Sequence, residues 1–169
     1  FALNDRPYQA TGLPQQPVAQ LRAAAEKSPK DVGALAALGI ALAQSQQPTE
    51  AIPLLEKAAS QNPKNGAVFF ELVGAYLELD QTDRGVAFFQ SLLREKEGNS
   101  VAIHAALADL IATSGNPAAA LAHAETAQSR APQSAPVQSL LASVYLQLHD
   151  PRAEDALRLA EKLHKQEAN

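Results

Sequence analysis

Residues 51–63, with the sequence AIPLLEKAASQNP, decide how the rest of the chain is interpreted. Ala51, Leu55 and Ala58 recur at steps of three and four residues, which places them on one face of a helix. The polar residues between them fall on the opposite face. Pro63 ends the segment, because proline lacks the N–H that a helix needs and its ring clashes with the preceding turn. The stretch therefore predicts one amphipathic helix with a defined end.

The same pattern recurs along the chain. Pro29 closes the segment AQLRAAAEKSP and lies 34 residues before Pro63. Pro132 closes the segment AALAHAETAQSRAP and lies 69 residues after Pro63, which is two such periods plus one residue. A period of this length is typical of helix–turn–helix repeats, which bury their apolar faces by stacking on one another.

The repeats divide the chain into an arm and one helical domain. Proline and glycine punctuate residues 1–16 without a helical period, so we expect an extended arm or linker there and a repeat domain over residues 17–169. The domain is expected to begin with a lone helix at 18–28. Thr49 is expected to cap a helix, with Pro48 in the preceding turn. Four helix pairs follow the lone helix, at residues 32–65, 66–100, 101–134 and from 135 onward.

Composition excludes several classes of partner. The net charge is −4 and the basic residues are dispersed, so we expect no nucleic-acid partner. No apolar run approaches the about 20 residues that a transmembrane helix needs, so no membrane span is expected in this chain. The chain has no Cys, which leaves its redox compartment open. It also has no Met, which we interpret as a mature product after processing or an excised fragment.

No residue pattern indicates catalysis, a metal or a cofactor. The four histidines are not spaced to place two ligands on one helical face, so surface or packing roles are expected for them. The acidic residues do not follow the spacing of a calcium loop. The serines lack the strand–turn–helix context of a nucleophile, and no glycine-rich loop follows a strand. We therefore expect a protein that is not an enzyme.

The chain resembles the tetratricopeptide repeat family over roughly residues 17–166. The family places large residues, Leu-Gly and Tyr in the first helix of each repeat, and small residues with a closing Pro in the second. The family's signature Trp is absent, which leaves the subfamily open. The matching residues are Leu35, Leu38, Gly39, Leu42, Ala51, Leu55, Ala58 and Pro63; Phe69, Leu72, Tyr76, Gly85 and Phe89; Leu107, Ala108, Gly115, Ala120, Ala127 and Pro132; and Leu141, Ala142, Tyr145, Ala156 and Ala160.

This resemblance implies an all-α fold, a right-handed superhelical solenoid of about four full repeats plus an N-terminal partial repeat. Small residues are expected where the two helices of a repeat cross, and large residues between repeats. Phe89 rather than the adjoining Phe88 is expected in the core. The first helices of the repeats are expected to line a concave groove that receives an extended peptide or a partner's helix.

The helical phase assigns residues to that groove. Small residues such as Ala36, Ala105 and Ala112, together with Leu140, are also expected on its floor. The alternative that these are core residues, with the phase wrong by one, stays open. The candidate peptide- or partner-binding residues are Ile40, Gln44, Phe70, Glu71, Gly74, Leu77, Glu78, Asp109 and Thr113.

The resemblance also narrows the class of ligand. Chaperone-binding members of the family clamp a C-terminal carboxylate with Lys, Asn and Arg. Here the corresponding positions hold Ala36, Ile40, Glu71 and Ala106, so that clamp is absent and a role as an Hsp70 or Hsp90 cochaperone is disfavoured.

The expected function is a non-catalytic protein–protein interaction scaffold. Periplasmic members that assemble bacterial envelope, cytochrome or exopolysaccharide complexes look similar, so a periplasmic or envelope-associated location is expected, with a cytoplasmic one as the alternative. Two other functions stay open. The chain is then either a regulatory segment excised from a larger enzyme, or a structural protein that self-associates by placing its N-terminal arm in a neighbour's groove.

Overall fold

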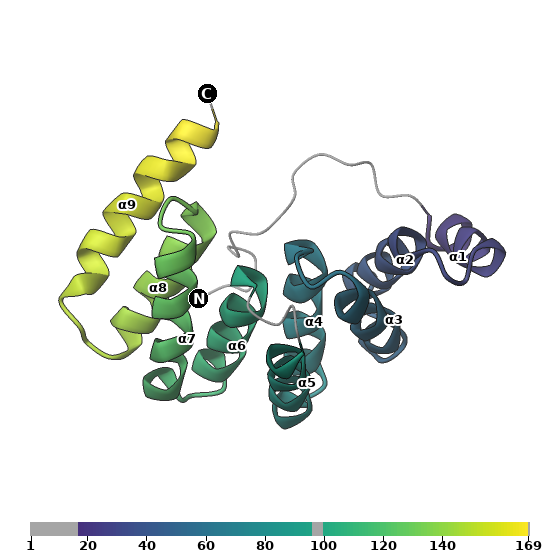
Figure 1. Ribbon diagram of the computed structural model, residues 1–169, viewed down its shortest axis with the longest axis horizontal. Helices are drawn as coiled ribbons and strands as arrows, with labels where there is room; N and C mark the ends of the chain where they lie inside the picture. The colour runs from purple at the N-terminus through teal and green to yellow at the C-terminus, as the bar shows by residue number, and fades with distance from the viewer. Residues whose placement is uncertain (1–16, 96–99, 169) are drawn as a thin grey trace. The chain divides into compact units, whose positions relative to one another are not determined.

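A computed structural model describes residues 17–95 and 100–168 of the chain. Within these residues it contains nine α-helices arranged as sequential antiparallel pairs, which confirms the all-α repeat array (Figure 1). The predicted arm at 1–16 lies outside the described residues. The helices are α1 (Val18–Lys27), α2 (Val32–Gln44), α3 (Pro48–Gln61), α4 (Gly66–Glu78), α5 (Thr82–Arg94), α6 (Val101–Thr113), α7 (Pro117–Arg130), α8 (Ala135–Gln147) and α9 (Arg152–Glu167).

The helices divide into two compact units. The division falls within α6, between Ile103 and His104. The N-terminal unit comprises the described residues up to 103, and the C-terminal unit comprises the described residues from 104 to 168.

Side-chain caps explain where several first helices begin. Asp31 precedes α2, and its Oδ1 accepts from the N–H of Gly33 at 2.8 Å and of Ala34 at 3.2 Å. Such a cap satisfies N–H groups that have no partner within the helix. Equivalent caps are Asn65 before α4, Ser100 before α6 and Ser134 before α8.

The prediction for the start of α3 was wrong. Pro48 is the first residue of α3 and is buried, and Gln47 precedes it without a side-chain cap. Thr49 lies inside the helix. Proline is well suited to the first helical position, because the N–H that it lacks has no acceptor there and its φ already has the helical value. The start of α7 combines a proline with a side-chain cap. Pro117 is its first residue, and Asn116 Oδ1 accepts from the N–H of Ala119.

The turn inside each repeat has one shared backbone conformation. Gln46, Asp80, Gly115 and His149 occupy corresponding positions, and each has a positive φ, between 54° and 96°. The N–H of the next residue donates to the carbonyl five residues earlier, which is the bond that closes a helix C-terminus of this type. These bonds are Gln47 to Leu42, Gln81 to Tyr76, Asn116 to Ile111 and Asp150 to Tyr145.

The core of the N-terminal unit combines close helix crossings with aromatic packing. A Cβ placed on Gly39 would lie 2.8 Å from two atoms of Leu55, so the crossing of α2 and α3 admits no larger residue there without a shift. Leu55 and Ala58 are buried, as predicted. Phe89 is fully buried, also as predicted, and its ring lies 5.5 Å from that of Phe69.

The core of the C-terminal unit uses smaller side chains. The buried residues of α7 are Ala120, Ala124 and Ala127, and Ala142 of α8 is fully buried as well. All three buried residues of α7 are alanine, the small residue type that was predicted for the second helix of this repeat. Gln138 is the one buried polar or charged residue among those described, and its amide donates to the carbonyl of Pro132 at 2.8 Å.

Candidate functional site

Seven of the predicted binding residues lie together on the first helices of the N-terminal unit. We call this set the first-helix surface, and α2 and α4, which carry it, contact each other. None of the seven is buried, so none is a core residue. The first-helix surface consists of Ile40 and Gln44 on α2 and of Phe70, Glu71, Gly74, Leu77 and Glu78 on α4.

The first-helix surface joins apolar and polar groups. Ile40, Phe70 and Leu77 are half-buried, which leaves part of each apolar side chain accessible. Beside them, Gln44 Nε2 donates to Glu71 Oε1 at 2.9 Å, linking the first helices of two successive repeats. This arrangement provides apolar contact area next to a carboxylate and an amide.

The small residues predicted on the groove floor are placed differently. Ala36, Ala105, Ala112 and Leu140 are buried, which favours the alternative that they are core residues. The first helix α2, for example, contacts its own second helix, α3, and also α1 and α4. Its apolar stripe is therefore wider than the stripe of a helix with one neighbour.

The remaining two predicted residues belong to the C-terminal unit. Asp109 and Thr113 lie on α6, and Thr113 Oγ1 donates to Asp109 Oδ1 at 3.3 Å. Asp109 is half-buried and Thr113 is exposed. Both are therefore surface residues of α6.

A tyrosine, a glutamate and an arginine connect successive repeats of the N-terminal unit. The hydroxyl of Tyr76 on α4 donates to Glu56 Oε1 on α3 at 2.7 Å, and Arg84 on α5 reaches the same oxygen at 3.0 Å. We call these three residues the first latch. Burial, and then the hydrogen bond to Glu56, raise the pKa of Tyr76, so its hydroxyl stays a donor at all ordinary pH values.

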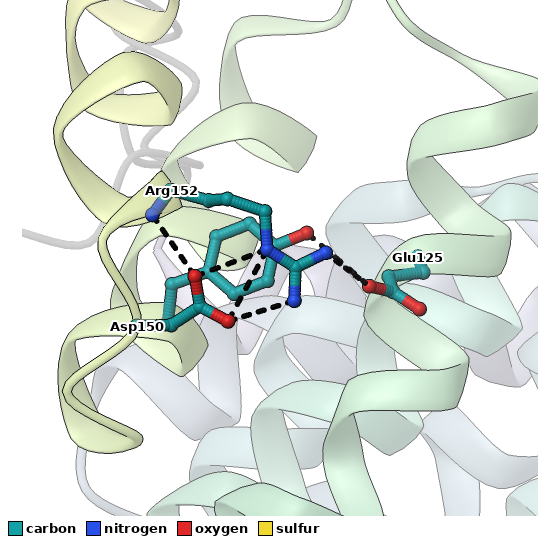
Figure 2. A network of polar contacts seen from close by, with 4 residues as sticks. Glu125, Asp150 and Arg152 are labelled. Carbon is teal, nitrogen blue, oxygen red and sulfur yellow. Dashed lines mark hydrogen bonds and ion pairs between the residues drawn. The ribbon is translucent and has the colours of Figure 1, made fainter.

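A second latch connects the helices of the C-terminal unit (Figure 2). The hydroxyl of Tyr145 on α8 donates to Glu125 Oε1 on α7 at 3.2 Å, and Arg152 Nη1 on α9 lies 3.2 Å from the same oxygen. The guanidinium of Arg152 also lies 4.4 Å from the centre of the Tyr145 ring, within the range of a cation–π interaction. Arg152 Nη2 lies 2.7 Å from Asp150 Oδ2. The hydrogen bonds that Asp150 accepts from the side chain and the backbone of Arg152 lower the pKa of its carboxyl.

The pair at the start of the array carries reversed charges. Arg22 on α1 contacts Glu50 on α3 at 3.0 Å. Relative to the first latch, 34 residues later, arginine stands in the place of Glu56 and glutamate in the place of Arg84. An ion pair thus links α1 to α3 as another links α3 to α5, with the opposite polarity.

Two histidines also meet, although their spacing did not suggest it. His104 on α6 and His123 on α7 lie with their Nδ1 atoms 3.1 Å apart. Both are half-buried, and burial lowers the pKa of each imidazole below its usual value of 6.5. The search for ligand pairs within one helix missed this contact, because the two residues face each other across a helix–turn–helix. Their separation of 19 residues, close to that of each Glu–Tyr pair, was the available signal.

Metal sites and membrane spans were both sought among the described residues. These residues contain no group of three or more His, Cys, Asp and Glu side chains that is arranged to hold a metal ion. Every buried side-chain nitrogen or oxygen in the same residues has a hydrogen-bond partner. Among the nine helices, none combines the length and the apolar composition that crossing a membrane requires.

Comparison with solved structures places this geometry among known folds. TTC0263, a tetratricopeptide protein from Thermus thermophilus, has a TM-score of 0.69 and 18% identity over 88% of this chain and 80% of its own. MamA from Desulfovibrio magneticus RS-1 has a TM-score of 0.62 and 14% identity over 90% and 86%. YrrB, described as a tetratricopeptide protein with an unusual peptide-binding site, has a TM-score of 0.55 and 20% identity over 86% and 75%.

Comparison of the sequence gives the family directly. No curated protein matches the sequence. Two family models, both described as tetratricopeptide repeat, match residues 8–65 and residues 42–110. Together the two matches run from residue 8 to residue 110, and the helix pairs continue in the same pattern through α9. The chain belongs to the tetratricopeptide repeat family.

Proposed function

We propose that this chain is a non-catalytic scaffold that binds an extended peptide or a partner's helix on its first-helix surface. The observation that carries the proposal is the grouping of half-buried Ile40, Phe70 and Leu77 around the Gln44–Glu71 hydrogen bond. Apolar side chains that stay partly accessible beside defined polar groups are typical of protein-binding surfaces. YrrB, whose fold is similar, is described as having a peptide-binding site, which supports the proposal.

The charges of this surface indicate the chemistry of the ligand. Glu71 and Glu78 lie on the same helix as Phe70 and Leu77. We expect a ligand with one aromatic or leucine anchor and a nearby lysine or arginine. The anchor contributes most of the affinity, and the acidic groups mainly affect the association rate and its dependence on salt.

We further propose that the scaffold serves the assembly of a bacterial envelope, cytochrome or exopolysaccharide complex and lies in the periplasm. The similar folds of bacterial proteins from Thermus thermophilus and Desulfovibrio magneticus support a bacterial setting. Alkaline phosphatase is active only after export. A fusion of this enzyme to the full-length gene product therefore tests the location, and an inactive fusion contradicts it.

The binding proposal is tested with displayed peptides that combine one apolar anchor with one basic residue. Affinities of the selected peptides are measured by fluorescence anisotropy for the intact chain and for the variant Phe70→Ala. Truncation of an aromatic anchor costs about 2 kcal/mol or more, so we expect the dissociation constant to rise more than about tenfold. Glu71→Lys is expected to have a smaller effect, which decreases further at high salt.

The matched control is Leu157→Ala, which removes an exposed apolar side chain of α9. This variant should bind the selected peptides normally. If Phe70→Ala binds as well as the unaltered chain, the first-helix surface is not the binding site. If Phe70→Ala unfolds the protein while Leu77→Ala binds normally, Phe70 is a packing residue and the proposal fails.

A further inference from the structure

The contact between His104 and His123 has the geometry of a single shared proton. The Nδ1 atoms are 3.1 Å apart, and the ring centres are 5.4 Å apart. The distance between the ring centres exceeds the distance between the nitrogens by about twice the distance from an imidazole centre to one of its ring atoms. The two nitrogens therefore lie near the line that joins the ring centres. Each Nδ1 therefore points at the other, and the Nδ1–H of one ring donates to the lone pair of its partner.

This orientation disfavours a shared metal ion. Two imidazoles that bind one metal direct their lone pairs at a point to the side of the line between the nitrogens, at about 2.0–2.1 Å from each. Here the lone-pair directions of His104 and His123 meet head-on. Both rings would have to rotate before they formed a chelate, whereas the hydrogen bond needs no change.

We propose that His104 and His123 form a pH-sensitive clasp that holds α6 against α7 at neutral pH and releases it in acid. When both imidazoles are neutral, one N–H lies between the facing nitrogens and one lone pair accepts it. When both are protonated, each Nδ1 carries a proton. Two N–H donors and two positive charges then face each other 3.1 Å apart. That separation is favourable only when one nitrogen donates and the other accepts.

The surroundings strengthen this response. Burial disfavours the charged form of each ring and lowers both pKa values. The partner ring and Arg130 on α7 lower the pKa of His104 further. Glu125 on α7 contacts Tyr145 and Arg152, and Asp109 on α6 contacts Thr113. The neighbouring helix α8 contains no Asp, Glu, Lys, Arg or His.

The sign of the stability change follows from these directions. In the unfolded chain both histidines bind protons near their usual pKa of 6.5, while in the folded chain they bind protons only at lower pH. Between these values the unfolded state holds more protons, so stability falls as the pH falls. The contribution of the pair is therefore complete above about pH 6.5 and is lost below it.

The test compares melting temperatures at pH 7.5 and pH 5.0 for three forms of the full chain. They are the unaltered protein, His123→Gln, and the control His164→Gln, which changes an exposed histidine of α9 in the same unit. Other groups that titrate in this range affect all three forms equally. We expect acidification to lower the melting temperature of the unaltered protein and of the control by about 2–4 °C more than that of His123→Gln. Equal decreases in all three forms overturn the proposal.

A second measurement needs no variant to fold. In protein with 15N-labelled histidine, a scalar coupling between the Nδ1 atoms of His104 and His123 reports the hydrogen bond directly. We expect this coupling at pH 7.5 and its disappearance at the lower pH at which the ring nitrogen shifts report two imidazolium groups. Absence of the coupling at pH 7.5, or its persistence once both rings are imidazolium, contradicts the clasp.

Discussion

The first and second latches share one hydrogen bond and differ in what supports the tyrosine. In both, a tyrosine of a first helix donates to a glutamate that lies 20 residues earlier in the chain. Behind Tyr76 stands Phe89, whose ring meets the tyrosine ring edge to face at 6.0 Å. Over Tyr145 lies instead the guanidinium of Arg152.

The difference follows from the second helix that each repeat supplies. The buried positions of α5 are Gly85, Phe89 and Leu92, and those with the same spacing in α9 are Ala156, Ala160 and Leu163. Alanine therefore stands in α9 where α5 has phenylalanine. In the second latch the arginine also comes from one turn earlier, at the start of α9. The tyrosine–glutamate bond is thus a property of the repeat, whereas its support depends on the neighbouring helix.

The largest expected effect is the loss of the aromatic support. Phe89→Ala removes a fully buried ring from contact with Tyr76 and Phe69, and we expect a loss of about 3–5 kcal/mol in the free energy of unfolding. Arg152→Gln removes the exposed support of the second latch and should cost clearly less. Urea unfolding followed by circular dichroism measures both. Equal losses would mean that the two supports are equivalent and that our comparison is wrong.

A smaller effect is expected from the hydrogen bonds themselves. Tyr76→Phe leaves Glu56, whose side chain is 24% exposed, without the hydroxyl, and should cost about 1–2 kcal/mol. Tyr145→Phe should cost less than about 1 kcal/mol, because Glu125 is 43% exposed and water replaces the lost donor. The same unfolding measurement applies to both variants. A larger loss for Tyr145→Phe would show that exposure does not set the strength of these bonds.

The smallest effect is expected at the reversed pair. Arg22 and Glu50 are 44% and 55% exposed, so a double-mutant cycle with Ala should give a coupling energy of about 0.2–1 kcal/mol that decreases with salt. Exchanging the two residues, Arg22→Glu with Glu50→Arg, should restore the stability of the unaltered chain. If the exchanged form is as unstable as Arg22→Glu alone, the contact depends on side-chain shape rather than on charge.

The repeating apolar pattern made the fold predictable. Leu55, Ala58 and Phe89 are buried as expected. Their helical phase recurs in every repeat, so the assignment in one repeat supports the assignment in the others. The start of α3 was missed, since Pro48 is compatible both with a turn and with a first helical position. Whether the first-helix surface binds a partner stays a prediction, although none of the nine candidate residues is buried.

Polar contacts between helices were harder to predict. Each latch joins residues about 20 and 27–28 positions apart, and no rule for a single helix detects such spacings. The His104–His123 contact has the same origin, because it depends on how α6 and α7 pack and not on either helix alone. A comparison of polar residues at the repeat period, as was made for the apolar ones, would have aligned Glu56 with Glu125 and Tyr76 with Tyr145.

The ion pairs also give the array an order that its backbone does not. The left-handed turns have the same backbone conformation in every repeat, so they carry no information about the order of the repeats. The charges forbid some of the possible orders. A duplicated first repeat would set Glu56 against a second copy of Glu50, and joining α1 directly to the second repeat would set Arg22 against Arg84. A designer who extends this array by duplicating repeats must therefore also change the charged residues that face each other at every new junction.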